Sequence, residues 1–151
     1  LITFKVKDSS ISLDVYTTCP ETIFGVAFVV MAHDHDLVDV LVTQSQKASL
    51  QEYQNLVAQK NEANIDKKNV EKSGCFSGSY VINPINNQAV PLYFSNYVLK
   101  DYGTGIVMGV PAHDERDYEF AQNSNIAFKR VIQNPLGDLE GAYSGDGILI
   151  N

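Results

Sequence analysis

Seven consecutive apolar residues, Val26 to Ala32 (VAFVVMA), set the strictest limit on the fold of this chain. The run has the length of a strand and is rich in β-branched residues, which predicts a strand buried on both faces. Alternating apolar and polar residues predict two earlier strands, Ile2–Val6 and Ile11–Tyr16, on either side of a turn-like segment at 7–10. The first part of the chain is therefore expected to be built of strands.

Strand patterns return in the second half of the chain around one helical pattern. Strands are predicted at SYVIN, VPLYF, NYVL and GTGIVMGVP, and at the two segments that close the chain, FKRVIQ and GILIN. The segment 113–122 (HDERDYEFAQ) has the pattern of a capped helix. This half is also expected to form a sheet, with one helix inserted.

A second helical region lies between the two strand-rich parts. Asp36 is predicted to cap a short turn over residues 37–40. Residues 45–59 place four apolar side chains at helical spacing on one face: Leu50, Tyr53, Leu56 and Val57. The polar segment Asn61–Ser73 is predicted to be a mobile connection. Together these patterns predict an α+β domain: a small, mostly antiparallel sheet or β-barrel-like core with flanking helices.

The composition is that of a folded domain. With 151 residues, 44% hydrophobic and 10% aromatic, the chain has room for one domain with a core. No apolar run approaches the ~20 residues of a membrane span, so we expect no membrane partner. The chain starts without Met, and we expect a piece of a longer protein with any targeting signal outside it. Two cysteines favour a reduced, intracellular setting with both thiols free.

The net charge argues against a free-standing nucleic-acid-binding protein. Eighteen acidic and 11 basic residues give a formal net charge of −7. Such a surface repels a polyanion on average. A nucleic acid delivered by a neighbouring domain is still compatible with this charge.

The stretch YTTCPETIFG crowds three threonines and a cysteine around a proline. The hydroxyls of Thr17, Thr18 and Thr22 have the chemistry of an oxyanion or substrate-orienting site for a carbonyl or a ribose. The alternative is a strand end followed by a helix start, with Thr18 as the cap, Pro20 at the first helical position and Glu21 favoured by the helix dipole. The stretch by itself favours this structural interpretation.

The segment HDERD starts a predicted helix directly after a strand that contains glycines. Asp114 and Asp117 have the spacing of a capping box, which is a structural device at helix starts. The same geometry puts two carboxylates on the first helical turn, where they could bind an ammonium group or act as a general base. The structural interpretation is again the simpler one.

Three other features carry weaker signals. His33 and His35 would share one face of a strand and could ligate a metal, but no further ligands follow at a recognisable spacing, which favours a solvated loop. The glycines of GTG, 103–105, would allow close approach of a ligand or of backbone, or form a bulge. Cys19 could act as a nucleophile only with a base, which His113 could supply through the fold.

Taken together and in order, two segments resemble one family. TTCPETIFG and, further along, INPINNQAVPLYFSNYVLKDYGTGIVMGVPAHDERDYEFA resemble the editing domain of leucyl-tRNA synthetases, a large insertion in a class I aminoacyl-tRNA synthetase. Editing domains for isoleucine and valine share the threonine turn and the PAHD core, whereas Met108, Val110 and residues 115–120 favour the leucine branch. The resemblance implies one editing domain over 1–151, excised from a longer synthetase, with a β-barrel-like core.

The resemblance also implies roles for individual residues. Asp117 would hold the α-ammonium group of a misattached amino acid, as both cap and anchor. Thr22 would occupy the space that leucine needs and so exclude the correct product. Thr17 and Thr18 would lie along the aminoacyl group and help to position the water. The walls and floor of the pocket would be formed by Tyr102, Met108, Val110, His113 and Asp114.

The implied reaction is post-transfer editing, the hydrolysis of the ester that joins a noncognate amino acid to leucine tRNA. A synthetic pocket separates side chains that differ by one methylene by only ~1–3 kcal/mol, so a second site with inverted size selection is needed. Norvaline, methionine and isoleucine are the expected errors. We expect no cofactor in this domain, with ATP and magnesium confined to the parent enzyme's synthetic site. The expected partners are the acceptor end of leucine tRNA and the remainder of the synthetase, with no DNA, in the cytoplasm or an organelle.

Cys19 departs from the family pattern, in which an arginine usually stands between the second threonine and the proline. A thiol in place of a multi-donor cation leaves the level of activity open. Three alternatives therefore stay open at this point. They are an editing domain of the valyl or isoleucyl type, a non-catalytic insertion that positions tRNA, and a β-domain that binds a free amino acid.

Overall fold

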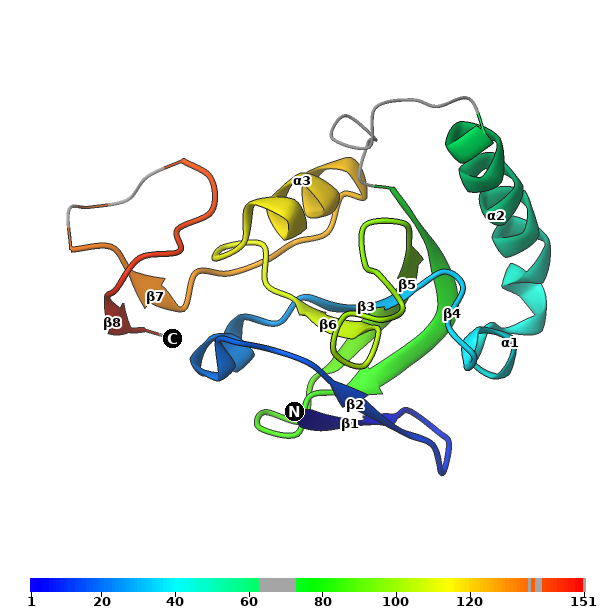
Figure 1. Ribbon diagram of the computed structural model, residues 1–151. Helices are drawn as coiled ribbons and strands as arrows, with labels where there is room; N and C mark the ends of the chain where they lie inside the picture. Colours follow the sequence, from blue (N-terminus) through cyan, green and yellow to red (C-terminus); the bar gives the residue numbers. More distant parts are fainter. Residues whose placement is uncertain (63–72, 136, 138–139, 151) are drawn as a thin grey trace.

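The computed structural model describes residues 1–62, 73–135, 137 and 140–150, which adopt an α+β fold around one large sheet (Figure 1). Its strands are β1 (Ile2–Val6), β2 (Ser12–Val15), β3 (Phe28–Ala32), β4 (Gly74–Ile82), β5 (Ala89–Ser95), β6 (Ile106–Gly109), β7 (Ile132–Gln133) and β8 (Ile148–Leu149). Its helices are α1 (Val38–Leu41), α2 (Lys47–Glu62) and α3 (Glu115–Asn123), with 3-10 helices η1 (Pro20–Gly25) and η2 (Gln44–Gln46). No helix in the described part of the chain is long and apolar enough to cross a membrane.

Six strands form the main sheet in the order β2-β1-β4-β5-β3-β6, and β7 pairs with β8 separately. Neighbouring strands of the main sheet are antiparallel, except that β3 and β5 run parallel. The predicted mostly antiparallel α+β fold is therefore confirmed. The predicted barrel is not formed, because the edge strands β2 and β6, each of four residues, meet only through an isolated bridge from Tyr16 to Val107. The described strands leave the sheet open.

Strand β3 lies between two layers of the core, as the apolar run at 26–32 predicts. All of its residues are buried, and their side chains alternate between the two layers. Val29 and Met31 belong to the layer that includes residues of β1, β2, α1 and α2. Phe28 and Val30 face the other layer, together with Phe120 of α3. The strand has a continuous apolar sequence because neither of its faces meets water.

Helix α2 buries a narrower stripe than its sequence predicts. Leu50 and Val57 are buried, and the Tyr53 hydroxyl donates a hydrogen bond to the Ser73 carbonyl (2.9 Å). Leu56 is 49% exposed, so its predicted place on the buried face is wrong. The physical reason is that residues 50, 53 and 57 already fill the stripe that faces the rest of the fold.

Segment 96–99 (NYVL) is not the strand that its composition predicts. The chain leaves β5 at Ser95 and turns, because the Tyr97 amide donates a hydrogen bond to the Ser95 hydroxyl (3.2 Å). The predicted mobile connection, Asn61–Ser73, lies mostly outside the described residues, and α2 continues as far as Glu62. Both cysteines are free, as the composition predicts.

Candidate functional site

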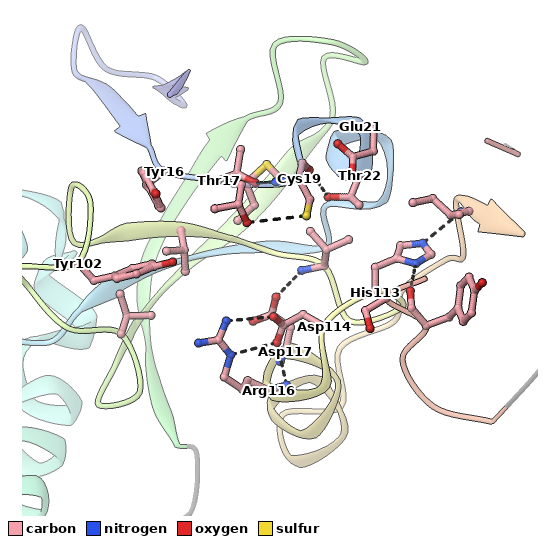
Figure 2. A pocket seen from close by; sticks show the side chains of 18 of the residues that line it. Tyr16, Thr17, Cys19, Glu21, Thr22, Tyr102, His113, Asp114, Arg116 and Asp117 are labelled. Carbon is pink, nitrogen blue, oxygen red and sulfur yellow. Dashed lines mark hydrogen bonds and ion pairs between the residues drawn. The ribbon is translucent and has the colours of Figure 1, made fainter. Parts of the chain in front are cut away.

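The predicted site residues gather around one cavity of about 420 Å³ (Figure 2). Segments 16–22, 97–117 and 143–146 contribute most of its lining. The cavity is lined by every predicted site residue: Thr17, Thr18, Thr22, Tyr102, Met108, Val110, His113, Asp114 and Asp117. Binding sites for small molecules have volumes of ~300–1,000 Å³, so this cavity suits a small ligand or one end of a larger one.

The threonine stretch is a tight turn held by its own hydrogen bonds. Thr17 Oγ1 accepts a hydrogen bond from the Cys19 amide (3.0 Å), and Thr22 Oγ1 donates one to the Cys19 carbonyl (2.8 Å). Thr22 is 5% exposed, so its side chain is buried as well as bonded. The two bonds span two and three residues, so local sequence shapes this wall of the cavity.

The structural interpretation of this stretch is confirmed in part. Pro20 lies at the start of η1 and Glu21 lies in its first turn, as predicted. Thr18 is not the cap, because the cap position falls on Cys19, which makes no side-chain cap bond. The cap lies one residue later than predicted, and Thr18 lines the cavity instead, with its Oγ1 3.8 Å from the Cys19 Sγ.

Asp114 is the N-cap of α3, as the capping signal predicts. Its Oδ1 accepts hydrogen bonds from the Arg116 amide (2.8 Å) and the Asp117 amide (3.2 Å). The Arg116 guanidinium also binds both carboxylate oxygens (Nε–Oδ1 3.3 Å, Nη2–Oδ2 3.0 Å). Desolvation acts to raise the pKa of Asp114, but the hydrogen bond and charge of Arg116 outweigh it and lower that pKa. Asp114 is therefore ionised at neutral pH.

Asp117 lies on the first turn of α3 and is only 6% exposed. Its Oδ2 accepts a hydrogen bond from the Val110 amide (2.9 Å), and its Oδ1 accepts one from the Tyr97 hydroxyl (3.0 Å). Burial and the charge of Asp114 raise the pKa of Asp117 to about 7. The predicted capping box is only half formed, because the Asp114 amide donates to the Val110 carbonyl (3.0 Å) instead. Asp117 is therefore not a cap, and its carboxylate is bonded to other segments.

His113 joins the start of α3 to the C-terminal part of the chain. Its Nε2 accepts hydrogen bonds from the Val131 and Ile132 amides (3.1 and 3.2 Å), so Nδ1 carries the proton and donates to the Tyr143 carbonyl (2.8 Å). Burial lowers the pKa of the imidazole, which favours the neutral ring that these bonds require. Because both nitrogens are engaged, His113 does not supply the base that a Cys19 nucleophile requires.

The apolar wall of the cavity carries Tyr102, Met108 and Val110. Met108 and Val110 are buried, whereas Tyr102 is 50% exposed and meets Tyr16 edge-on, with ring centroids 5.2 Å apart. Gly103 has a φ of +58°, and a Cβ at this position would lie 2.4 Å from the Tyr16 ring. This glycine of the GTG motif therefore permits close approach of a side chain.

The cavity is acidic overall. Its described lining includes four carboxylates and one guanidinium, that of Arg116, and the carboxylates are Glu21, Asp114, Asp117 and Asp146. Cys19, which is exposed, adds no cation to the threonine wall. Such a lining favours a ligand with a positively charged group, because each carboxylate attracts it and few cations compete.

The HDHD segment is a loop between β3 and α1 and lies away from this cavity. His35 Nδ1 accepts a hydrogen bond from the Leu37 amide (3.1 Å), and its Nε2 faces the Thr104 carbonyl (3.1 Å). Asp36 does not cap the following helix as predicted, because Leu37 takes that position and Asp36 pairs with Lys100 (2.6 Å). Within the described residues, no group of three or more His, Cys, Asp and Glu side chains could hold a metal ion.

Sequence reasoning missed Tyr97 and the segment 143–146, which both line the cavity. Tyr97 reaches Asp117 across 20 residues, and Tyr143 reaches His113 across 30 residues. No spacing signal connects positions so far apart. For Tyr97 the one chemical hint is that a phenol out of solvent usually finds a polar partner, whereas Tyr143 meets His113 through its backbone carbonyl, which no side-chain pattern reveals.

Comparisons with known proteins agree with the resemblance seen in the sequence. A family model described as the leucyl-tRNA synthetase editing domain matches residues 1–151. The leucine–tRNA ligase of Pseudothermotoga lettingae is 45% identical over 152 residues, covering 99% of this chain and 18% of the relative. That of Clostridium botulinum strain Hall is 49% identical over 159 residues, covering 99% and 19%. The chain thus spans about a fifth of the length of the curated relatives it matches.

A solved structure has a similar fold. It is described as the ternary complex of Agrobacterium radiobacter K84 agnB2 LeuRS, tRNA and LeuAMS. The match covers 95% of this chain and 17% of the matched synthetase chain, with a TM-score of 0.71 and 33% sequence identity. The family model and the relatives also decide against the valyl or isoleucyl alternative. The chain therefore belongs to the leucyl-tRNA synthetase editing-domain family.

Proposed function

We propose that this chain hydrolyses the aminoacyl ester of mischarged leucine tRNA, releasing norvaline, isoleucine or methionine while excluding leucine. The observation that carries the proposal is the buried carboxylate of Asp117, which shares one cavity with the hydroxyl-bearing turn of Thr17 and Thr22 (Figure 2). A carboxylate and a set of hydroxyls suit an α-amino ester, because its ammonium group and its carbonyl group are attached to the same carbon.

Asp117 is the proposed binding group for the ammonium. Each of its carboxylate oxygens accepts one protein hydrogen bond, from Tyr97 or from Val110, and each keeps a lone pair for the ligand. Burial costs the ionised carboxylate its hydration, which raises its pKa to about 7. A bound ammonium group compensates for that loss, since an opposite charge at close range favours the ionised form.

Thr22 is the proposed size filter. Its side chain is buried and its hydroxyl is bonded to the Cys19 carbonyl, so its position in the cavity wall is fixed on two counts. A fixed side chain rejects a ligand side chain that branches at Cγ, as leucine does, because a packed wall yields only at a cost of ~1–3 kcal/mol. Norvaline and methionine carry no branch, and isoleucine branches at Cβ instead.

Thr17 and Thr18 are proposed to place the water and the ester carbonyl. Thr17 Oγ1 already accepts the Cys19 amide, so its proton is directed to another acceptor. The water oxygen attacks the carbonyl carbon, the bond from that carbon to the ribose oxygen breaks, and the ribose oxygen takes up the proton that the water loses. Donors aimed at the developing oxyanion matter here, since losing one typically costs ~10²–10³-fold in rate. The proposed reaction uses no cofactor, and ATP and magnesium would serve only the parent enzyme's synthetic site.

Most of the affinity for tRNA is proposed to come from the remainder of the synthetase. The net charge of −7 opposes binding of a polyanion, and the cavity needs only the single-stranded end of the tRNA. The chain alone is expected to bind whole leucine tRNA with a dissociation constant above about 1 µM at physiological salt. A filter-binding titration that gives tighter binding would contradict the proposal that most of the affinity comes from the remainder of the synthetase.

The test is single-turnover deacylation of norvalyl and leucyl leucine tRNA. The enzyme, in excess, is this chain and also a full-length leucine–tRNA ligase that carries it as the editing domain. We expect release of norvaline and retention of leucine. Asp117→Ala is expected to reduce norvaline release by about 100-fold, as for a buried charge pair that loses one partner. Thr22→Ala is expected to release leucine as well.

The outcomes separate the remaining alternatives. Equal rates of norvaline release by the parent chain and by Asp117→Ala would show that Asp117 does not bind the ammonium group as proposed. If neither the chain alone nor the full-length ligase releases norvaline, the same assay is repeated with Cys19→Arg. Norvaline release by this variant would mean that Cys19 weakens the site, and continued absence of release would favour a non-catalytic insertion that positions tRNA. Calorimetry with free norvaline against an aminoacyl-adenosine mimic tests the third alternative, which requires preference for the free amino acid.

A further inference from the structure

Tyr97 contacts Asp117 from a different part of the chain, the turn that follows β5. Its hydroxyl donates a hydrogen bond to Oδ1 of Asp117 (3.0 Å), while the Val110 amide donates one to Oδ2 (2.9 Å). Each carboxylate oxygen thus has one donor, and neither donor belongs to α3 itself. Two donors on two oxygens fix both the position and the rotation of the carboxylate plane.

The geometry points to Tyr97 as a positioning residue of the editing reaction: its phenol orients the Asp117 carboxylate and favours the ionised form that binds the substrate's ammonium group. This inference rests on the proposed function. Tyr97 contributes through Asp117, and its loss is therefore expected to change how activity depends on pH.

The phenol is itself held in place by its surroundings. The Tyr97 ring packs against Phe120 of α3, with ring centroids 5.7 Å apart. Its amide is bonded to the hydroxyl of Ser95, which is fully buried and donates in turn to the Ser73 carbonyl (2.7 Å). A donor that is fixed before the ligand arrives needs no rearrangement during binding, which is the physical basis of preorganisation.

The ionisable groups around Asp117 act in opposite directions. Burial and the charge of Asp114 raise the pKa of Asp117 to about 7, whereas the Val110 amide, the Tyr97 hydroxyl and the Arg116 charge lower it. Burial raises the pKa of Tyr97 far above its ordinary value, so the phenol stays a donor. The other ionisable groups that line the cavity are Glu21, Cys19, Tyr16, Tyr102, His113, Tyr143 and Asp146. Without the phenol, the ionised form of Asp117 loses one of three groups that favour it.

Tyr97→Phe tests the inference, because it removes the hydroxyl and keeps the ring against Phe120. The kcat/KM for norvalyl leucine tRNA is measured from pH 5.5 to 8 in the full-length ligase that carries this chain. This ratio reports the ionisation of the free enzyme. Loss of a hydrogen bond to a charged group is expected to raise the pH at which kcat/KM falls on the acid side by about one unit. The kcat/KM of the variant is then about tenfold below that of the parent at pH 6 and less than about twofold below it at pH 8.

Tyr118→Phe is the matched control. It also removes a phenol hydroxyl from the α3 region, but this hydroxyl is exposed and accepts a hydrogen bond from Gln122 (2.9 Å) outside the cavity. Its pH profile is expected to match that of the parent. If Tyr97→Phe lowers kcat/KM by the same factor at every pH, its role is merely structural and the inference is overturned.

A second measurement does not require catalysis. The carboxyl ¹³C resonance of Asp117 is followed by NMR against pH in this chain and in its Tyr97→Phe variant, with amide spectra to check the fold. The titration midpoint is expected to rise by about one pH unit in the variant. If the parent ligase releases no norvaline, the proposed function fails while this midpoint still tests the contact. An unchanged midpoint overturns the inference whatever the activity.

Discussion

Two walls of the same cavity are built in different ways. The threonine turn is held by hydrogen bonds that span two and three residues, from Thr17 and Thr22 to Cys19. The wall at the start of α3 is held by bonds that span seven, 20 and 30 residues, made by Asp117 and His113. The first wall therefore depends on its own sequence. The second depends on the whole fold, and packing sets the ionisation of its groups.

Asp117→Asn gives the largest expected effect on the α3 wall. Because the pKa of Asp117 is raised to about 7, the folded state keeps a proton that the unfolded state has lost, and stability falls as pH rises from about 4 to about 7. The isosteric neutral amide removes this loss. Relative to Asp117→Asn, the parent chain is expected to lose up to about 4 kcal/mol of unfolding free energy across that window.

Urea unfolding at a series of pH values measures this difference. The exposed Asp39→Asn is the control, and its stability curve is expected to run parallel to that of the parent chain. If the Asp117→Asn curve also runs parallel, then packing does not set the ionisation of Asp117. The α3 wall would then not differ from the threonine wall in this respect.

His113→Ala tests the long-range bonds of the same wall. It leaves the Val131 and Ile132 amides without their acceptor, and it is expected to cost about 3 kcal/mol of unfolding free energy. The pKa of His113 is lowered in the folded chain, so its contribution is full above about pH 6.5 and is lost as pH falls through the lower folded value. Urea unfolding at pH 7.5 and 5 measures both effects. Equal losses at the two pH values would contradict them.

His33→Ala is the control for this variant, since its ring lies beside Tyr53 and outside the cavity. It is expected to cost less than about 1 kcal/mol. Hydrogen exchange adds a local readout, because the amides of residues 131 and 132 are expected to lose protection only in His113→Ala.

Thr17→Val sharpens the description of the threonine wall. It keeps the branched shape but removes the acceptor of the Cys19 amide, at an expected cost of about 1 kcal/mol. Thr17→Ser keeps the hydroxyl and is expected to recover most of this stability. A loss above about 3 kcal/mol in thermal or urea unfolding would show that the turn depends on distant packing after all.

Cys19→Arg gives the smallest expected change in stability, within about 0.5 kcal/mol, because the side chain is exposed. Its effect is electrostatic. If the new cation contacts one phosphate of the single-stranded tRNA end, the slope of log affinity against log salt steepens by about 0.7. Cys19→Ser, which adds no charge, is the control, and an unchanged slope in Cys19→Arg would place this position away from the tRNA.

The accuracy of the sequence predictions follows the same division. The buried strand β3, which covers 28–32 of the predicted 26–32, the proline start of η1 and the Asp114 cap were all predictable, because each depends on neighbouring residues. The predictions of a cap at Thr18 and a strand at 96–99 are wrong. The cap falls one residue later, on Cys19, and the hydrogen bond from the Tyr97 amide to the Ser95 hydroxyl turns the chain after β5. The barrel is wrong because closure depends on how two edge strands meet, and no local pattern encodes that.

The sequence by itself determined most of the elements, the family and nine of the residues that line the cavity, because apolar periodicity and long motifs are properties of neighbouring positions. The tertiary structure alone decided the environment of those residues. It placed Tyr97 against Asp117, turned His113 toward the C-terminal segment and left the sheet open. Burial and opposing charges act through space, so the ionisation of Asp117 emerges only when distant segments pack around it.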